Sequence, residues 1–372
     1  MFKLEALQAL HGDCLLLQWG TDDAPHLMLI DGGPTTVYRD SLRPRLVELI
    51  DEHGEPLVID LLMLSHIDDD HINGLLDFAK ELDDNRTNDL HGRDPLRIKV
   101  RRLWHNSLEG LLDDPLVERA TASVTASIGA ALQLPVGGSE ADTDAHFHGK
   151  VLASVPQGQE LHRYAVQLGW RLNAPFDEPA LVMRGVRDKP VRIEGLTMDV
   201  VAPAAAEVEA LRIAWKAKRR DDGTLAAYSD RSPYNLSSIV VLASFDGRRM
   251  LLTGDARGDH VLAGLEANGL LDDDGRIHVD LLKLPHHGSK NNVKKEFFER
   301  VTADHYVVSG DRGRFPNPAR DAMQWLHDAR GDDDYTVHCT YEIDDMRALF
   351  GDRLVTPRAQ ARSVTAELES AV

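Results

Sequence analysis

The sequence predicts an α/β protein in which helices cover two β-rich halves. Apolar runs of strand length alternate with segments of helical periodicity along the 372 residues, and several of these runs end in a cluster of Asp, His or Gly. The halves share this design, although no repeat of solenoid period is visible. A chain of this length, with 42% hydrophobic residues, can build a large packed core with insertions.

The first half begins as a β-meander. Apolar patterns predict three strands, a helix, a buried strand, a second helix and a basic strand, with an acidic surface loop over 83–94. These elements are Phe2–Leu10, Cys14–Trp19, Leu27–Ile30, 41–53, Val58–Leu64, Gly74–Leu82 and Arg97–Trp104. Region 109–190 is mostly helical in pattern, and we expect an insertion or cap large enough to form a protein-partner surface.

The second half repeats strand and helix signals. Asp246-Gly247 predicts a tight hairpin turn, and a polar loop over 221–235 precedes that hairpin. The predicted elements are Leu196–Val201, 205–220, Ile239–Ser244, Met250–Leu252, 257–268, Val279–Leu284, Tyr306–Ser309 and 318–329. We expect the main domain to span 1–340 and a C-terminal extension to span 341–372.

The charge balance argues against sequence-blind binding of long nucleic acid. The formal net charge is -19, whereas such binding needs Lys and Arg to neutralise phosphates. A basic cluster over 216–220 can be a local binding face or simply a solvated helix end.

The cysteines and the apolar runs indicate the compartment. Only Cys14 and Cys339 occur, which gives no disulfide framework and no thiolate metal cluster. The first residues lack a secretory signal pattern, and no run of apolar residues is long enough to span a membrane. We therefore expect a cytoplasmic protein without a membrane partner; the oligomeric state is left open.

Candidate metal ligands stand at the ends of four predicted strands. Asp31 alone is readily explained as a turn residue, and so is Asp255 in Thr253-Gly254-Asp255. The run Ser65–His71 is different, because its crowded carboxylates follow a wholly apolar strand and a metal would explain them better than a solvated loop. Imidazole and carboxylate together suit zinc, manganese or iron. The full candidate set is Asp31, His66, Asp68, Asp70, His71, Asp255, His286 and His287.

These motifs resemble those of the metallo-β-lactamase superfamily, most closely the soluble domain of bacterial DNA-uptake competence channel proteins. They fall in the family's order over about residues 1–320. The matching segments are Gly12-Asp13, Leu29–Gly33, Ser65–Gly74, Asn235–Ser238, Leu252–Ala256 and Leu284–Ser289. The resemblance implies an αβ/βα sandwich with a largely helical insertion and two divalent ions, zinc or manganese, at one edge between the sheets.

The resemblance also implies a role for each ligand. His66 and Asp68 would hold one ion, Asp70 and His71 the other, and Asp255 would bridge them. Either His286 or His287 would complete the second site while the other faces substrate, which leaves open the ligand of the pair. Asp31 would orient a ligand histidine through a hydrogen bond.

Ser289 with Asn291 and Asn292 can contact a substrate oxyanion, or can simply form a loop.

Three positions depart from the family pattern. Asp68 stands where most relatives have a histidine, and a further expected histidine appears as Asn235 or Ser237, so the first site is short of nitrogen. This shortage favours harder ions such as manganese or magnesium, or partial occupancy of that site. His105 could supply the missing imidazole, or could be an ordinary exposed histidine. A histidine common in relatives before a proline is Phe315 here.

The implied reaction is attack of a metal-bound hydroxide on phosphorus or a carbonyl carbon, with Asp68 or Asp70 as proton acceptor. His287 is also a catalytic candidate. The preferred substrate is a phosphodiester in a nucleotide or short single-stranded nucleic acid, which the negative net charge tolerates better than a long duplex. The alternatives are a lactone, thioester or small-ester hydrolase, and a binding or effector subunit of a multi-protein system.

Overall fold

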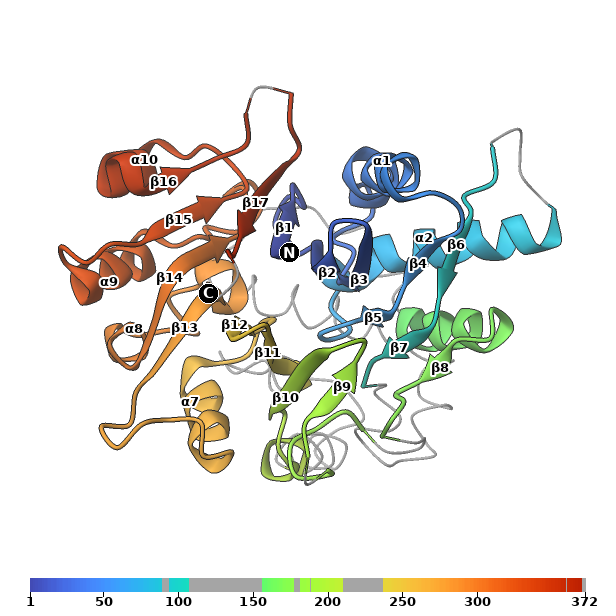
Figure 1. Ribbon diagram of the computed structural model, residues 1–372. Coiled ribbons are helices and arrows are strands. Elements are labelled where there is room, and N and C mark those ends of the chain that lie inside the picture. Colours follow the sequence, from blue (N-terminus) through green and yellow to red (C-terminus); the bar gives the residue numbers. More distant parts are fainter. Residues whose placement is uncertain are drawn as a thin grey trace, which may run out of the picture.

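A computed structural model describes residues 1–88, 94–106, 156–176, 181–187, 189–209, 237–358 and 360–369. In this part of the chain, two large sheets pack face to face and helices cover their outer faces (Figure 1). This arrangement confirms the αβ/βα sandwich predicted from the sequence.

The first sheet has the strand order β17-β1-β2-β3-β5-β7-β8. It is antiparallel from β17 to β3 and parallel from β3 to β8. Its strands are β1 (Phe2–Leu7), β2 (Leu15–Thr21), β3 (Ala24–Ile30), β5 (Leu61–Met63), β7 (Arg102–Trp104), β8 (Arg171–Leu172) and β17 (Ser363–Glu367).

The second sheet has the order β16-β15-β14-β13-β12-β11-β10-β9. It is antiparallel from β9 to β12 and parallel from β12 to β16. Its strands are β9 (Val191–Ile193), β10 (Leu196–Ala202), β11 (Val240–Phe245), β12 (Arg248–Leu252), β13 (Ile277–Lys283), β14 (Val301–Val308), β15 (Thr336–Cys339) and β16 (Leu354–Val355).

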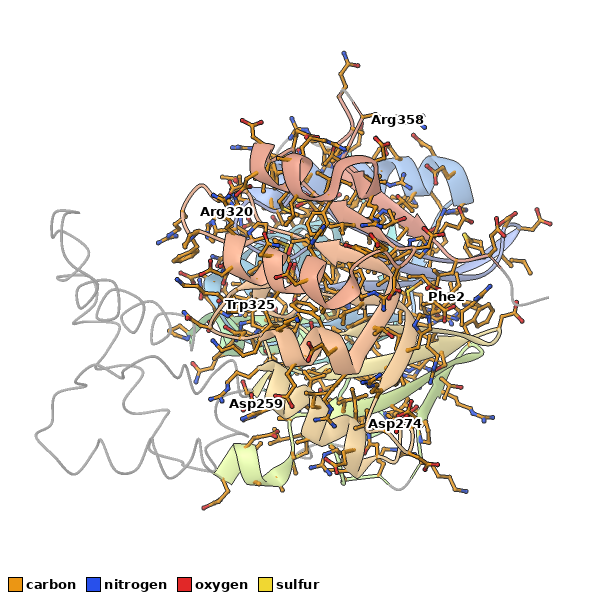
Figure 2. The ribbon with its side chains drawn as sticks, turned by 90° about the vertical axis from the view of Figure 1, so that its left-hand side faces the viewer. Phe2, Asp259, Asp274, Arg320, Trp325 and Arg358 are labelled. Carbon is orange, nitrogen blue, oxygen red and sulfur yellow. The ribbon has the colours of Figure 1, made fainter. Side chains whose placement is uncertain are left out.

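Three apolar layers hold the sandwich together. The central layer lies between the sheets and includes Leu4, Met28 and Trp104 from the first sheet with Met198 and Met250 from the second. A second layer packs the first sheet against α1 (Arg43–His53), α2 (Asp69–Thr87) and the helix over 156–167. The third packs the other sheet against α7 (Gly258–Ala267), α8 (Lys295–Arg300), α9 (Arg320–Arg330) and α10 (Asp344–Phe350), the layer that faces the viewer in Figure 2.

Two strands that the sequence predicts as continuous are each divided. The predicted strand Val58–Leu64 becomes β4 (Leu57–Ile59) and β5, and Arg97–Trp104 becomes β6 (Ile98–Val100) and β7; β4 and β6 pair in a small separate sheet. The breaks fall at Asp60 and Arg101, whose side chains form an ion pair. The buried carboxylate of Asp60 needs a charged partner such as Arg101, so the backbone turns at Asp60 instead of continuing as one strand.

Helix α2 is longer than predicted. It begins at Asp69, inside the ligand run, and continues through residues expected in the acidic loop. Asp83 pairs with Arg86 one turn later, and Asn88 ends the helix in a left-handed conformation.

The described strands within the predicted C-terminal extension 341–372 pair with strands of both sheets. Strand β16 pairs with β15 in the second sheet, whereas β17 pairs antiparallel with β1 in the first sheet. Val364, Ala366 and Leu368 enter the central apolar layer. Strand β17 is too short to show a clear strand pattern in the sequence, and its pairing partner β1 lies at the other end of the chain.

The predicted insertion 109–190 falls largely outside the described residues, as do most of the predicted helix 205–220 and the basic cluster over 216–220. The described part of the predicted insertion 109–190 contains the helix over 156–167 and strand β8, which extends the first sheet. The protein-partner surface there stays a prediction. In the described part of the chain, no helix is long and apolar enough to cross a membrane.

The position of β17 generates a stability prediction. Ala366 is buried in the central layer, whereas Thr365 beside it is exposed. We expect Ala366→Asn to lower the free energy of unfolding by about 2 kcal/mol or more, because it buries an amide without partners. Thr365→Asn is the matched control and should change it by less than about 0.5 kcal/mol. Urea denaturation measures both; equal, small effects would mean that β17 does not belong to the fold.

Candidate metal centre

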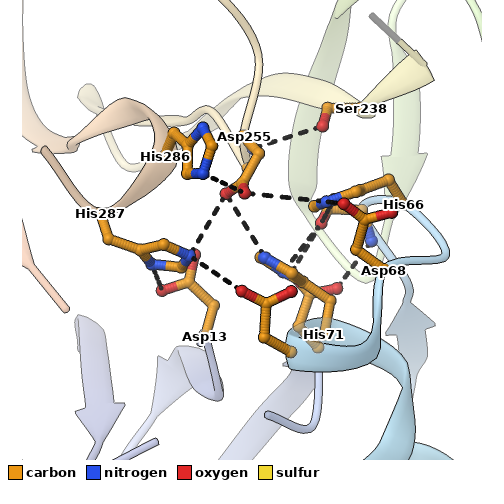
Figure 3. Close-up of polar contacts among 12 residues, drawn as sticks. Asp13, His66, Asp68, His71, Ser238, Asp255, His286 and His287 are labelled. Carbon is orange, nitrogen blue, oxygen red and sulfur yellow. Dashed lines mark hydrogen bonds and ion pairs between the residues drawn. The ribbon is translucent and has the colours of Figure 1, made fainter. Parts of the chain in front are cut away.

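The predicted ligands meet at one edge of the sandwich, where strands of both sheets end (Figure 3). The run Ser65–His71 joins β5 to α2, and Asp68 is the residue before the first turn of that helix. Asp255 follows β12, and His286 and His287 follow β13. Residues from both halves of the sequence therefore form one cluster.

Two glycines bring the end of β3 against α2. A Cβ atom on Gly74 would lie 1.9 Å from the carbonyl oxygen of Gly32, so no larger residue fits there. The Gly32 amide donates to the carbonyl oxygen of His71 over 2.7 Å. This close contact lets Oδ2 of Asp31 reach Nδ1 of His71 at 2.8 Å.

The buried carboxylate of Asp255 lies at the centre of the cluster. Its Oδ1 is 3.4 Å from Nε2 of His71 and 3.6 Å from Nε2 of His287. Its Oδ2 is 3.7 Å from Nε2 of His66 and 3.4 Å from Nε2 of His286. Each carboxylate oxygen thus faces two imidazole nitrogens.

The remaining carboxylates divide the cluster into two subsites that share Asp255. Oδ2 of Asp68 is 3.5 Å from Nε2 of His66, and Oδ2 of Asp70 is 3.9 Å from Nε2 of His287. We call His66, Asp68 and His286 with Oδ2 of Asp255 the first subsite. We call Asp70, His71 and His287 with Oδ1 of Asp255 the second subsite.

Both histidines of the Pro285–Gly288 turn face Asp255, whereas the resemblance implied that only one of them would be a ligand. His286 and His287 have left-handed backbones, with φ of 45° and 54°, and the next residue, Gly288, has φ of 76°. In an extended strand, neighbouring side chains would point to opposite faces. Such backbone geometry is costly for non-glycine residues and is concentrated at functional sites. Nε2 of His286 faces the first subsite, for which the sequence predicts a shortage of nitrogen.

The other ring nitrogen of each histidine contacts a residue outside the subsites. Ser65 Oγ is 3.0 Å from Nδ1 of His66, and Asn292 Oδ1 is 2.9 Å from Nδ1 of His286. Nδ1 of His287 is 2.8 Å from Oγ of Ser309. Such contacts fix the orientation of metal-binding imidazoles and leave Nε2 for the metal.

The donor atoms of the cluster fit a bound cation. Among the described residues, the buried Nε2 atoms of His66, His71 and His287 have no hydrogen-bond partner, and neither do Oδ1 of Asp68 and Oδ1 of Asp255. Leaving these polar atoms unpaired costs free energy that coordination would recover. Imidazole with carboxylate is a donor set for zinc or manganese.

The electrostatics of the cluster point the same way. Burial acts to raise the pKa of Asp255, but the imidazoles of His286, His71 and His287 outweigh it, so this pKa lies well below its usual range. Burial acts to lower the pKa of His71, yet the carboxylates of Asp255 and Asp31 hold it well above its ordinary value. A cation must therefore displace a proton from His71, and metal affinity should increase with pH.

His105, suggested as an extra ligand, is buried and lies against Asn173 and His162. Its backbone is held by the side chain of Asn173, and its ring packs edge-on against His162 at 5.8 Å between centroids. Burial, with a smaller effect from His162, lowers the pKa of His105 to about 4. His105 is therefore a buried neutral histidine, and neither an exposed residue nor a member of the two subsites.

Three other predicted residues have more limited roles or cannot be placed. Asn235 lies outside the described residues, and Ser237 is buried, but it is Ser238 whose Oγ accepts the backbone N–H of Asp255 over 3.3 Å. Ser289 accepts the backbone N–H of Asn291 within its own turn. An oxyanion contact by Ser289 stays a prediction.

Asp13 belongs to the cluster but was not among the predicted ligands. Ligand atoms of Asp13, His71, Asp255 and His287 all lie within 4.8 Å of one another. Oδ2 of Asp13 is also 2.8 Å from Nζ of the buried Lys283. An acidic residue in the turn between two apolar strands was the available signal, but the sequence does not reveal that this turn lies beside β13.

Comparisons with known proteins give weak likenesses. No family model and no curated protein matches the chain. A putative metal-dependent hydrolase from Parabacteroides distasonis is 10% identical, with 90% of this chain and 93% of that chain covered and a TM-score of 0.35. The metallo-β-lactamase fold protein YhfI from Bacillus subtilis is 10% identical, with 91% and 96% covered and a TM-score of 0.37. A diphosphatase from the PhnP family is 10% identical, with 99% and 98% covered and a TM-score of 0.41. At this level of similarity, the function must be argued from the site itself.

The two-subsite geometry generates a metal-binding prediction. We expect two divalent ions per chain, with His286→Ala losing the ion of the first subsite and His287→Ala losing that of the second. Asp255→Ala should lose both, because each ion would use one of its oxygens. Elemental analysis measures the stoichiometry, and chelation should lower the melting temperature of the wild type because ions stabilise the state that binds them.

The control for these variants is His278→Ala, which alters a half-exposed histidine on β13, the strand that precedes His286 and His287. It should keep both ions. Full metal content in His286→Ala would contradict the assignment of His286 to the first subsite.

The lowered pKa of His105 generates a pH prediction. The folded state keeps His105 neutral down to about pH 4, whereas an unfolded histidine titrates near 6.5. Its contribution to stability is therefore complete above about pH 6.5 and is lost as the pH falls toward 4. Between pH 7 and 5 this loss reaches up to about 2 kcal/mol.

Denaturation of chelated protein at pH 7 and pH 5 tests this. His105→Gln should show a smaller loss of stability than the wild type, and His278→Gln should match the wild type. Equal losses in all three proteins would mean that His105 is not held neutral by the fold.

Proposed function

We propose that the protein is a metal-dependent hydrolase that cleaves a phosphodiester bond in a nucleotide or a short single-stranded nucleic acid. The observation that carries this proposal is the shared carboxylate of Asp255, which joins two subsites of equal donor composition. Paired sites of this kind serve phosphatases and nucleases. The resemblance of the sequence motifs to the metallo-β-lactamase superfamily supports the same class of enzyme.

Zinc or manganese suits both subsites. With His286 in the first subsite, each subsite has two imidazoles and two carboxylates, so the shortage of nitrogen that favoured harder ions no longer applies. Bound ions would generate a hydroxide nucleophile near neutral pH and stabilise the negative charge that develops on phosphoryl oxygens.

Asp70 is the carboxylate best placed to move a proton. Its side chain is 17% exposed, compared with 8% for Asp68 and 3% for Asp255. Oδ2 of Asp70 faces His287, and we assign Oδ1 as the atom that accepts a proton from the attacking water. Asp68 and His287 were also candidates for catalytic residues. In this proposal Asp68 is instead a metal ligand of the first subsite and His287 a metal ligand of the second.

The guanidinium of Arg314 lies in the group of side chains next to the second subsite and supports an anionic substrate. The ring of His11 packs edge-on against Phe315 at 5.4 Å between centroids, and the Arg314 guanidinium lies 5.5 Å from the centre of the Phe315 ring. Burial lowers the pKa of His11, while Asp70 acts to raise it and Arg314 acts to lower it, which places this group near the second subsite. In a chain of net charge -19, this single guanidinium favours a short phosphodiester over a long duplex.

Activity assays test the proposal. With manganese or zinc, the protein should hydrolyse bis-p-nitrophenyl phosphate and dinucleotides but not simple lactones. Asp70→Asn should lower kcat by about 100-fold or more, since it removes a proton acceptor as well as a ligand. The proposal would be overturned if the protein hydrolysed lactones or thioesters but not phosphodiesters. It would also be overturned if a variant that binds no metal kept the full biological effect of the wild-type protein.

Arg314 offers a sharper test of the anionic substrate. We expect Arg314→Gln to raise KM for a dinucleotide several-fold with little change in kcat, because a lost binding contact affects both ground and transition states. Arg276→Gln removes the same charge from an exposed turn at the opposite end of β13 and should leave KM unchanged. Equal effects of the two variants would contradict a contact between Arg314 and substrate.

A further inference from the structure

Lys283 is a buried cation next to the second subsite. It ends β13, is fully buried, and its Nζ lies 2.8 Å from Oδ2 of Asp13, which is itself only 1% exposed. Nζ also donates to the carbonyl oxygen of Leu284 over 3.1 Å. Replacing such an ion pair by apolar residues is often neutral or stabilising, so stability alone does not explain its presence.

A chain of polar contacts connects Lys283 to His287. Oδ1 of Asp13 accepts a hydrogen bond from the hydroxyl of Ser309, and Oγ of Ser309 lies 2.8 Å from Nδ1 of His287. Nδ1 of His287 is also 3.4 Å from Oδ1 of Asp13. The chain therefore runs from Lys283 through Asp13 and Ser309 to the ring of a second-subsite histidine.

The direction of this chain follows from counting protons. The ammonium of Lys283 keeps Asp13 a carboxylate, which can only accept hydrogen bonds. Ser309 has one hydroxyl proton and gives it to Asp13, so its oxygen can only accept from His287. Nδ1 of His287 must then carry the proton, and Nε2 presents a lone pair toward Asp255 and Asp70.

We propose that Lys283 is a positioning residue for the second subsite, acting through Asp13 and Ser309 to fix His287 in its metal-binding tautomer. This inference rests on the proposed metal-dependent function. The first subsite is oriented by other residues: Asp31 accepts a hydrogen bond from the hydroxyl of Ser65, whose oxygen contacts Nδ1 of His66, and Asn292 contacts His286. Loss of the Lys283 chain should therefore weaken one subsite and spare the other.

Asp13→Asn is the decisive variant because it preserves shape but can reverse the chain. An amide group can donate to Ser309, which would then donate to Nδ1 of His287 and leave the proton on Nε2. We expect the affinity for manganese at the second subsite to fall about 10- to 100-fold, as is typical when such outer contacts are lost, with the first subsite unchanged. Calorimetric titration of chelated protein with manganese measures both.

Lys283→Met and the double variant Lys283→Met/Asp13→Asn separate positioning from folding. The single variant leaves a buried carboxylate unpaired and should be destabilised, whereas the double variant contains no unpaired charge and should recover stability. Its second-subsite affinity should remain low. If the double variant recovers both stability and affinity, the Lys283–Asp13 pair is merely structural and the proposal is wrong.

A tautomer measurement makes the test independent of the catalytic proposal. Nitrogen NMR of metal-free protein should show the proton of His287 on Nδ1 in the wild type and on Nε2 in Asp13→Asn. Asp280→Asn is the control. Asp280 lies on β13, like Lys283, and pairs with Arg248 of β12, so this variant should change neither the tautomer of His287 nor the metal affinity. The same tautomer in wild type and Asp13→Asn would overturn the proposal even if phosphodiester cleavage were established. Conversely, a move of the His287 proton from Nδ1 to Nε2 in Asp13→Asn would support the proposal even if the protein did not cleave phosphodiesters.

Discussion

The buried carboxylate of Asp255 is the constraint on which the rest of the site depends. Four imidazole edges face its two oxygens: two come from the segment after β5 and the start of α2, and two from the turn after β13 in the other sheet. The sheets must therefore pack in one register, and the central apolar layer between them supplies the free energy that holds this register. The unpaired nitrogens and oxygens of the cluster cost stability, which a bound cation would return.

His66 and His287 have outer contacts of the same kind. In each case an aspartate carboxylate accepts a hydrogen bond from a serine hydroxyl, and the serine oxygen contacts Nδ1 of a histidine: Asp31 with Ser65 and His66, and Asp13 with Ser309 and His287. The buried Lys283 is found beside Asp13, and the pairing of β13 with β12 and β14 holds it there. A histidine ligand is useful only in the correct tautomer, so these outer contacts matter as much as the ligands themselves.

The structure departs from the sequence prediction where distant contacts override local patterns. The apolar run Val58–Leu64 predicts one strand, but the ion pair between Asp60 and Arg101 divides it and its neighbour. Likewise, β17 has a weak strand pattern and becomes part of the first sheet only through pairing with β1. His105 looked like a candidate ligand because it follows a strand, yet its ring lies against His162. In each case the deciding partner is far away in the sequence.

The sequence by itself indicated the α/β class and the Asp and His ligand candidates, because apolar strand runs and strand-end Asp and His residues are local features, and the resemblance of its motifs implied the sandwich arrangement. The tertiary structure alone decided how those ligands are shared. Left-handed backbones at His286 and His287 turn both rings toward Asp255, and the fold brings Asp13 to His287. Neither result can be read from spacing, because each depends on backbone geometry and on contacts between segments that only the folded chain brings together.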